Sequence, residues 1–257
     1  MKCFIDELSR KALEFASRYQ KPDFYIRFEA EVARSRHLYF TNPVATLVRE
    51  SIAEKLSQCE CLGHGLYHSS RVAWDCAALL DIELKQSGSM VADRERILLL
   101  GIVAGLLHDI ARCEPNHAEA GAREAARILR DFPFTEEEIS IICRAIRNHE
   151  AFSRPVPSIN PVGQLLSDCL YDADKFRWGV DNFTHTIWRM IDHQSLSPQA
   201  LIERFPWGID GIRKIAQTFR TPTGRQFGPD IIENGIAIGK DIYQYLLKRY
   251  GSTITPP

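Results

Sequence analysis

The sequence between residues 97 and 112 reads ILLLGIVAGLLHDIAR. It begins with an uninterrupted apolar run and ends in the pair His108-Asp109 followed by Ile-Ala-Arg. A membrane-spanning helix needs about 20 apolar residues, so this shorter run predicts a core helix of a globular protein. Because an ionised carboxylate is costly to bury without compensation, we expect a positive group to face Asp109.

Helical periodicity extends over most of the chain. Apolar residues recur at spacings of three and four in residues 4–19, 24–38, 44–56, 72–84, 94–107, 118–129, 136–147 and 231–250. Thr135 with Glu138 predicts a capped helix start. Breaks fall at Pro22, Pro43, Gly88, Pro115, Pro133 and around residues 155–161. Alternating strand patterns are nearly absent, so the sequence predicts an all-α helical bundle.

The bundle is predicted to have three parts. Residues 61–180 form the central part, residues 1–60 a helical N-terminal extension, and residues 181–257 a helical C-terminal extension packed on the core. In that last part, Pro206-Trp207-Gly208 and Gly228-Pro229 predict breaks between short helices before a final long one.

The balance of charged residues limits the kinds of binding partner that we expect. The 32 basic and 33 acidic residues give a formal charge of −1, so we expect neither a nucleic acid polymer nor a membrane as partner. The N-terminal MKCFIDE lacks the apolar region of a secretory signal, and we expect a cytoplasmic protein. Seven cysteines without a CxxC pair predict free thiols, with Cys59 and Cys61 structural.

Histidines and carboxylates gather at predicted helix ends. They are His64 and His68 in HGLYHSSRV, His108-Asp109, His117, His149, and Asp172 and Asp174 in DADK. A lone histidine is commonly a core residue bonded to a carbonyl. Imidazole nitrogen combined with carboxylate oxygen, without thiolate, instead suits divalent Mn, Fe, Co, Ni or Zn, with Mg as a further option.

In this order, the motifs resemble those of the HD-domain metal-dependent phosphohydrolases. The resemblance covers about residues 62–178 and implies a helical bundle with a metal site in its middle, here an HD-domain core over residues 61–180. It implies four ligands, which are His68, His108, Asp109 and Asp174. With two ions, Asp109 bridges them and His117 and His149 complete the second site. With one ion, those two histidines transfer protons or contact phosphate.

Three further positions affect the ligand set or the substrate pocket. Asp174 is preferred to Asp172 because the family places the ligand directly before a basic residue, and the two side chains point about 200° apart on a regular helix. Arg177 stands where some relatives have an acid, which affects the shape of the substrate pocket. His64 shares the helix face of His68 if that helix begins early, but Gly63 and Gly65 suit a turn equally well.

The resemblance implies a metal-dependent phosphohydrolase of the phosphomonoesterase, phosphodiesterase or nucleotidase type. Metal-activated water would cleave a phosphoester or phosphoanhydride of a small, nucleotide-like substrate. Besides Asp109, the candidate catalytic residues are Lys175, expected at the cavity rim against a phosphate, Arg71, which pairs with phosphate or orients a carboxylate, and His64. The alternatives are a di-iron oxygenase with the same ligands and a non-catalytic regulatory module. A homo-oligomer is left open.

Overall fold

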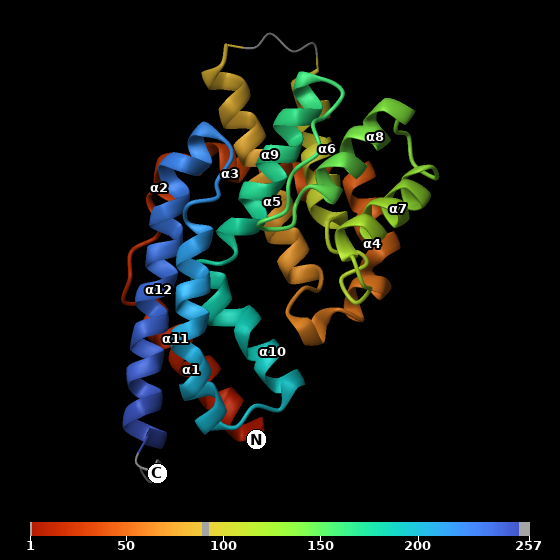
Figure 1. Cartoon of the computed structure of the whole chain (residues 1–257). Coiled ribbons are helices and arrows are strands. Elements are labelled where there is room, and N and C mark those ends of the chain that lie inside the picture. The colour runs from red at the N-terminus through yellow and green to blue at the C-terminus, as the bar shows by residue number, and fades with distance from the viewer. Residues whose placement is uncertain (1, 89–92, 252–257) are drawn as a thin grey trace.

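The all-α prediction is confirmed. A computed structural model describes residues 2–88 and 93–251, and it contains helices and no strand within those ranges (Figure 1). The helices of the N-terminal half are α1 (Lys2–Ala16), α2 (Asp23–Arg27), α3 (Glu29–Thr41), α4 (Pro43–Ser57), η1 (Glu60–Leu62), α5 (Leu66–Gln86), α6 (Arg94–Leu107) and α7 (His117–Leu129). Those that follow are α8 (Glu136–Arg147), α9 (Pro161–Phe176), η2 (Asn182–Thr186), α10 (Ile187–Gln194), α11 (Pro198–Ile215) and α12 (Pro222–Tyr250).

Helix α5 lies at the centre of the bundle and packs against α6 and α9, while α8 packs on α7 and α9 (Figure 1). The contact between α5 and α6 depends on Gly105. A Cβ atom there would lie 2.4 Å from the backbone of Ala73, closer than real Cβ contacts allow. The glycine therefore lets α6 approach α5 closely, just before α6 ends at Leu107 and is followed by His108 and Asp109.

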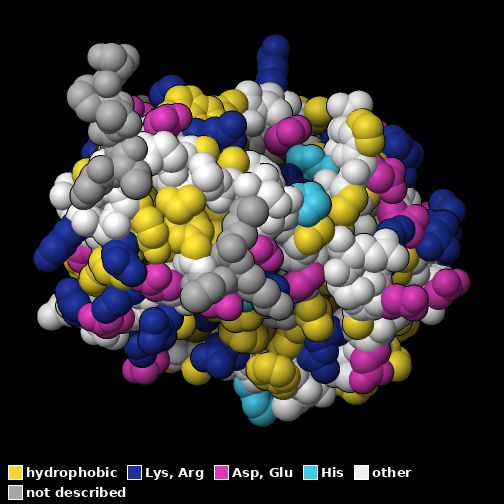
Figure 2. Space-filling model, turned by 90° about the horizontal axis from the view of Figure 1, so that it is seen from below, with side chains coloured by type: hydrophobic (Ala, Val, Ile, Leu, Met, Phe, Trp, Pro, Cys, Tyr) yellow, Lys and Arg dark blue, Asp and Glu magenta, His cyan; other side chains and the backbone are white. Residues whose placement is uncertain are grey.

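The terminal helices cover this core. Helices α11 and α12 run side by side in Figure 1, α1 packs on α12, and α3 packs on α5. The face shown in Figure 2 carries interspersed basic and acidic side chains. None of the described helices combines the length and apolarity that crossing a bilayer requires.

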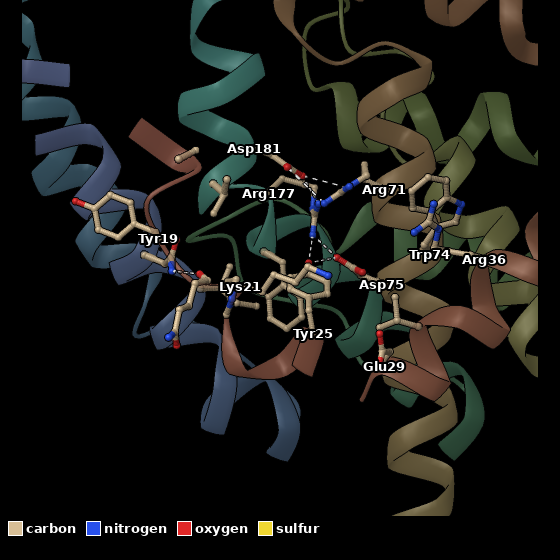
Figure 3. A pocket seen from close by; sticks show the side chains of 18 of the residues that line it. Tyr19, Lys21, Tyr25, Glu29, Arg36, Arg71, Trp74, Asp75, Arg177 and Asp181 are labelled. Atoms are coloured by element: carbon tan, nitrogen blue, oxygen red, sulfur yellow. Dashed lines mark hydrogen bonds and ion pairs between the residues drawn. The ribbon is translucent and has the colours of Figure 1, made fainter. Parts of the chain in front are cut away.

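A buried ionic network ties the N-terminal helices to the core (Figure 3). The Arg177 guanidinium, 4% exposed, pairs with the carboxylates of Asp75 and Asp181 and donates to the Tyr25 hydroxyl at 2.5 Å. Tyr25 in turn donates to Asp75 at 2.6 Å. These groups line a cavity of about 400 Å³ between α2, α3 and the core.

Three details of the helix prediction are wrong. The expected helix over residues 24–38 is two helices that meet at Phe28. The expected breaks at Pro206 and Pro229 lie inside α11 and α12, which continue through both prolines. A proline inside a helix costs about 3 kcal/mol. Buried apolar residues on both sides of each proline, such as Phe205 and Ile209 around Pro206, offset that cost at about 1.5–3 kcal/mol each.

Candidate metal centre

The predicted ligands come from the ends of five different helices. His68 lies in the first turn of α5, and His108 and Asp109 directly follow α6. His117 is the first residue of α7, His149 follows α8 by two residues, and Asp174 lies in the last turn of α9. Helix ends converge on the middle of the bundle, so residues over 100 positions apart in sequence become neighbours.

His64 lies outside α5, in the turn before it. Gly63 has a φ of +74°, in the left-handed region that glycine adopts without strain, and α5 begins only at Leu66. Of the two arrangements that the sequence allowed, the turn is therefore the observed one. It still brings the His64 ring next to that of His68, with 4.6 Å between the ring centroids.

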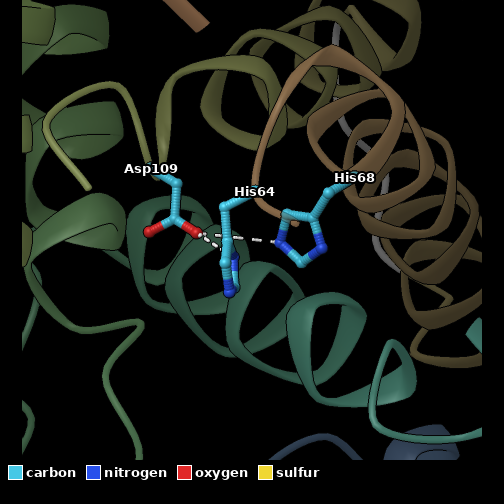
Figure 4. Close-up of side chains that lie close together, drawn as sticks. All are labelled: His64, His68 and Asp109. Carbon is cyan, nitrogen blue, oxygen red and sulfur yellow. Dashed lines mark ion pairs between the residues drawn. The ribbon is translucent and has the colours of Figure 1, made fainter. Parts of the chain in front are cut away.

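Asp109 presents its two carboxylate oxygens to two different groups of histidines. Its Oδ2 lies 2.8 Å from His64 Nδ1 and 3.7 Å from His68 Nε2 (Figure 4). The same oxygen lies 3.3 Å from His108 Nε2. Its Oδ1 lies 3.4 Å from His149 Nε2 and 3.8 Å from His117 Nε2.

Three overlapping groups in the described part of the chain have the spacing of metal ligands. They are His64–His68–Asp109, His68–His108–Asp174 and Asp109–His117–His149, each with its ligand atoms within 4.8 Å of one another. The six residues that the sequence singled out as ligands thus lie in one cluster, with His64 beside it.

Backbone carbonyls orient two of the rings. The Nδ1 atom of His108 lies 2.8 Å from the Gly105 carbonyl, and that of His149 lies 2.5 Å from the Ile146 carbonyl. Because a carbonyl only accepts, each Nδ1 is the donor, and a neutral ring then has its lone pair on Nε2, which faces the cluster. This is the arrangement that metal-binding histidines commonly have.

The cluster fits a divalent cation. Asp109 Oδ1 is buried and has no hydrogen-bond partner among the described residues. The Nε2 atoms of His68 and His108 face each other at 3.1 Å. That separation suits two ligands of one ion, each about 2.0–2.1 Å from it. The nitrogen and oxygen donors, without sulfur, suit the first-row transition metals.

Comparison with known proteins agrees with this geometry. Residues 65–176 match the family model of the HD domain. This match, over somewhat less than half of the chain, indicates that residues 65–176 form an HD domain. No curated protein matches the chain in sequence. A solved structure named as a predicted HD superfamily hydrolase, from an uncultured Thermotogales bacterium, is 20% identical with a TM-score of 0.46, covering 81% of this chain and 94% of that one.

Proton affinities within the HD domain are strongly perturbed. Burial opposes protonation of His108, but the carboxylates of Asp109 and Asp174 outweigh it and raise its pKa to about 10. Burial lowers the pKa of His68 to about 4. Burial and the neighbouring Arg112 lower the pKa of His117 to about 4. In the metal-free protein, His108 therefore supplies the positive charge that the sequence predicted beside Asp109.

Lys175 does not lie at the rim of the site, and that prediction is wrong. Its side chain is 4% exposed, and its Nζ donates to Asp174 Oδ2 at 2.5 Å and to the His149 carbonyl at 3.0 Å. This pairing, with help from the nearby histidines, outweighs burial and holds the pKa of Asp174 well below its usual range. Lys175 therefore belongs to the floor of the cavity.

Arg71 and Asp172 face away from the cluster. The Arg71 Nε lies 3.4 Å from Asp181 Oδ2, so in this structure the guanidinium orients a carboxylate. Asp172 is fully buried and accepts hydrogen bonds from the backbone N–H groups of Arg220 and Thr221, at 2.8 Å each. It therefore anchors the segment before α12, in agreement with the angular argument that separated it from Asp174.

Arg112 is a site residue to which the sequence analysis assigned no role. Its Nη1 lies 2.8 Å from His117 Nε2 and 3.9 Å from Asp109 Oδ1. An arginine can only donate, so it occupies the lone pair with which His117 would bind an ion. Its position three residues after Asp109, in the turn beyond the helix, was the feature of the sequence that could have indicated this role.

The cluster opens into a cavity of about 540 Å³. Arg112, Lys175 and Arg177 contribute positive charge to its wall, and Trp178 and Met190 contribute apolar surface. Arg177 is shared with the ionic network of Figure 3, because it lines both cavities.

Proposed function

We propose that this protein is a metal-dependent phosphohydrolase that cleaves a phosphoester or phosphoanhydride bond of a small, nucleotide-like substrate. The observation that carries the proposal is the placement of Asp109. One of its oxygens faces His64, His68 and His108, and the other faces His117 and His149. Cationic side chains line the same cavity.

In this proposal, His68, His108, Asp109 and Asp174 hold one divalent ion, of Mn, Fe, Co, Ni, Zn or Mg. Asp109, His117 and His149 hold a second. The bound metal supplies Lewis acidity and lowers the pKa of its water toward neutrality. Occupation of the second site requires Arg112 to leave His117 Nε2, so we expect the second ion to bind more weakly than the first.

In this proposal, the other residues of the cavity balance charge, transfer a proton or orient a neighbouring side chain. Arg112, once released from His117, places positive charge in the cavity where a phosphate would enter, whereas the charge of Arg177 is offset by Asp75 and Asp181. Lys175 neutralises the charge of Asp174. His64, half-buried and beside Asp109, is positioned to exchange a proton between that carboxylate and the cavity. Arg71 acts at a distance, by holding Asp181.

Two features support a small substrate. The cavity volume of about 540 Å³ is in the range of sites for small molecules. Charges of both signs are interspersed on the face seen in Figure 2, which does not resemble the basic surface that a nucleic acid polymer requires.

The proposal is tested by metal analysis of protein purified without chelators, followed by a phosphate-release screen over nucleotides with added Mn, Co, Ni or Mg. We expect phosphate release that depends on metal and is lost in Asp174→Asn. His193→Gln, which changes an exposed histidine outside the cluster, is the matched control and should keep full activity. Bound iron with oxygen-dependent turnover and no phosphate release would instead identify the oxygenase alternative.

A further inference from the structure

Two cysteines from distant parts of the chain lie together beside the metal centre. The Sγ atoms of Cys59 and Cys113 are 3.3 Å apart. Cys59, just after α4, is buried, whereas Cys113, in the turn after α6, is exposed. The Cys59 thiol is therefore shielded from small solutes, whereas Cys113 is open to them.

Cys59 is joined by backbone hydrogen bonds to the turn that carries His64, and Cys113 lies in the turn that begins with Asp109. The Cys59 carbonyl accepts from the N–H groups of Leu62 at 3.0 Å and His64 at 3.3 Å. On the other side, the Asp109 carbonyl accepts from the Arg112 N–H at 3.0 Å, one residue before Cys113. The two thiols thus face each other across the same pair of turns that bring His64 within 2.8 Å of Asp109.

We propose that Cys59 and Cys113 form a reversible redox site, at which a disulfide oxidant such as glutathione disulfide converts the two thiols into a disulfide that staples these turns together. Cys113 attacks the oxidant, whose S–S bond breaks, so that a mixed disulfide forms at Cys113 and the first glutathione thiol leaves with the proton. Cys59 then attacks the Cys113 sulfur, and the second glutathione thiol leaves. Two protein thiols are oxidised and one glutathione disulfide is reduced to two thiols.

The geometry requires a small movement. A disulfide bond is about 2.05 Å long, so the two sulfur atoms must approach by about 1.3 Å. The cross-link closes a loop of about 50 residues, which restricts the unfolded chain and stabilises the folded one. It also limits separation of the His64 and Asp109 turns.

The test treats the full chain with glutathione disulfide and maps its peptides without reduction. We expect a Cys59–Cys113 linked peptide pair that carries no glutathione and disappears with dithiothreitol. Cys59→Ser should stop at a glutathionyl group on Cys113, and Cys113→Ser should leave Cys59 a free thiol. Cys61→Ser is the matched control, because Cys61 is exposed and lies two residues from Cys59, and this variant should still form the link.

Two further measurements examine the consequences of the link. We expect the oxidised chain to melt at a higher temperature than the reduced chain, with the difference absent in Cys59→Ser. We also expect the oxidised chain to release bound metal to a chelator more slowly. This last measurement alone rests on the proposed metal centre, so its failure with an intact peptide map would count against the metal centre or its coupling to the cysteines. Retained glutathione on Cys113 in the unsubstituted chain, or a link through Cys61, would overturn the redox site.

Discussion

Metal binding should compete with a single proton on His108. The His108 Nε2 atom faces His68 Nε2 at 3.1 Å, and its pKa of about 10 means that the metal-free ring is charged at neutral pH. An ion at this position needs the Nε2 lone pair, so binding must release the proton. His68 and His117, with pKa values of about 4, are already neutral and release none.

The size of the pH effect on metal affinity follows from the release of this one proton. Below the His108 pKa, release of one proton strengthens apparent metal affinity about tenfold per pH unit, or about 1.36 kcal/mol. Between pH 7.5 and 9.0 the affinity should therefore rise about 30-fold. This window lies above the titration range of ordinary histidines, whose pKa is about 6.5.

The assay is competition for Mn²⁺ between the metal-free protein and a chelator whose own proton binding is known. A plot of the logarithm of affinity against pH should have a slope near one, and His193→Gln should keep that slope because His193 lies outside the cluster. A flat plot would refute the argument, since it would mean that His108 is neutral before metal binds or is not a ligand.

Other substitutions separate the roles of the cluster residues. Asp109→Ala should abolish tight metal binding while circular dichroism still reports a helical fold; full metal content by elemental analysis would refute its role as a ligand. His117→Ala should lower the metal content from about two ions per chain to about one, whereas an unchanged content with slower turnover would place His117 as a proton carrier. Arg112→Met should tighten the second ion, seen in the same titration, because the competing donor to His117 is gone; weaker binding would show that Arg112 supports the site. Lys175→Met should lower the free energy of unfolding of the metal-free protein by about 3–5 kcal/mol in urea, because Asp174 loses its buried partner; a change below about 1 kcal/mol would mean that this pair behaves like an exposed one.

The sequence was sufficient to predict which residues belong to the site. Helical periodicity placed His108 and Asp109 at the end of a core helix and His149 at the end of another, and the structure has both there. The order of the motifs then indicated which residues meet. The predicted Thr135 capping box is also present, with both of its hydrogen bonds.

The unpredictable part depended on contacts between distant elements. The angle of Lys175 on its helix gave a direction, but its burial depends on the His149 carbonyl at the end of α8. The contact of Arg112 with His117 depends on the turn between α6 and α7, in which Asn116 adopts a left-handed conformation. The pairing of Cys59 with Cys113 likewise joins turns more than 50 residues apart, for which periodicity offers no signal.

Anomalous X-ray diffraction from a crystal of the protein loaded with Mn²⁺ tests the central claim most directly. The account predicts a strong anomalous peak within bonding distance of His68, His108, Asp109 and Asp174, and a weaker one between Asp109, His117 and His149. A protein that is fully loaded by elemental analysis, but whose anomalous peaks all lie away from Asp109, would contradict it.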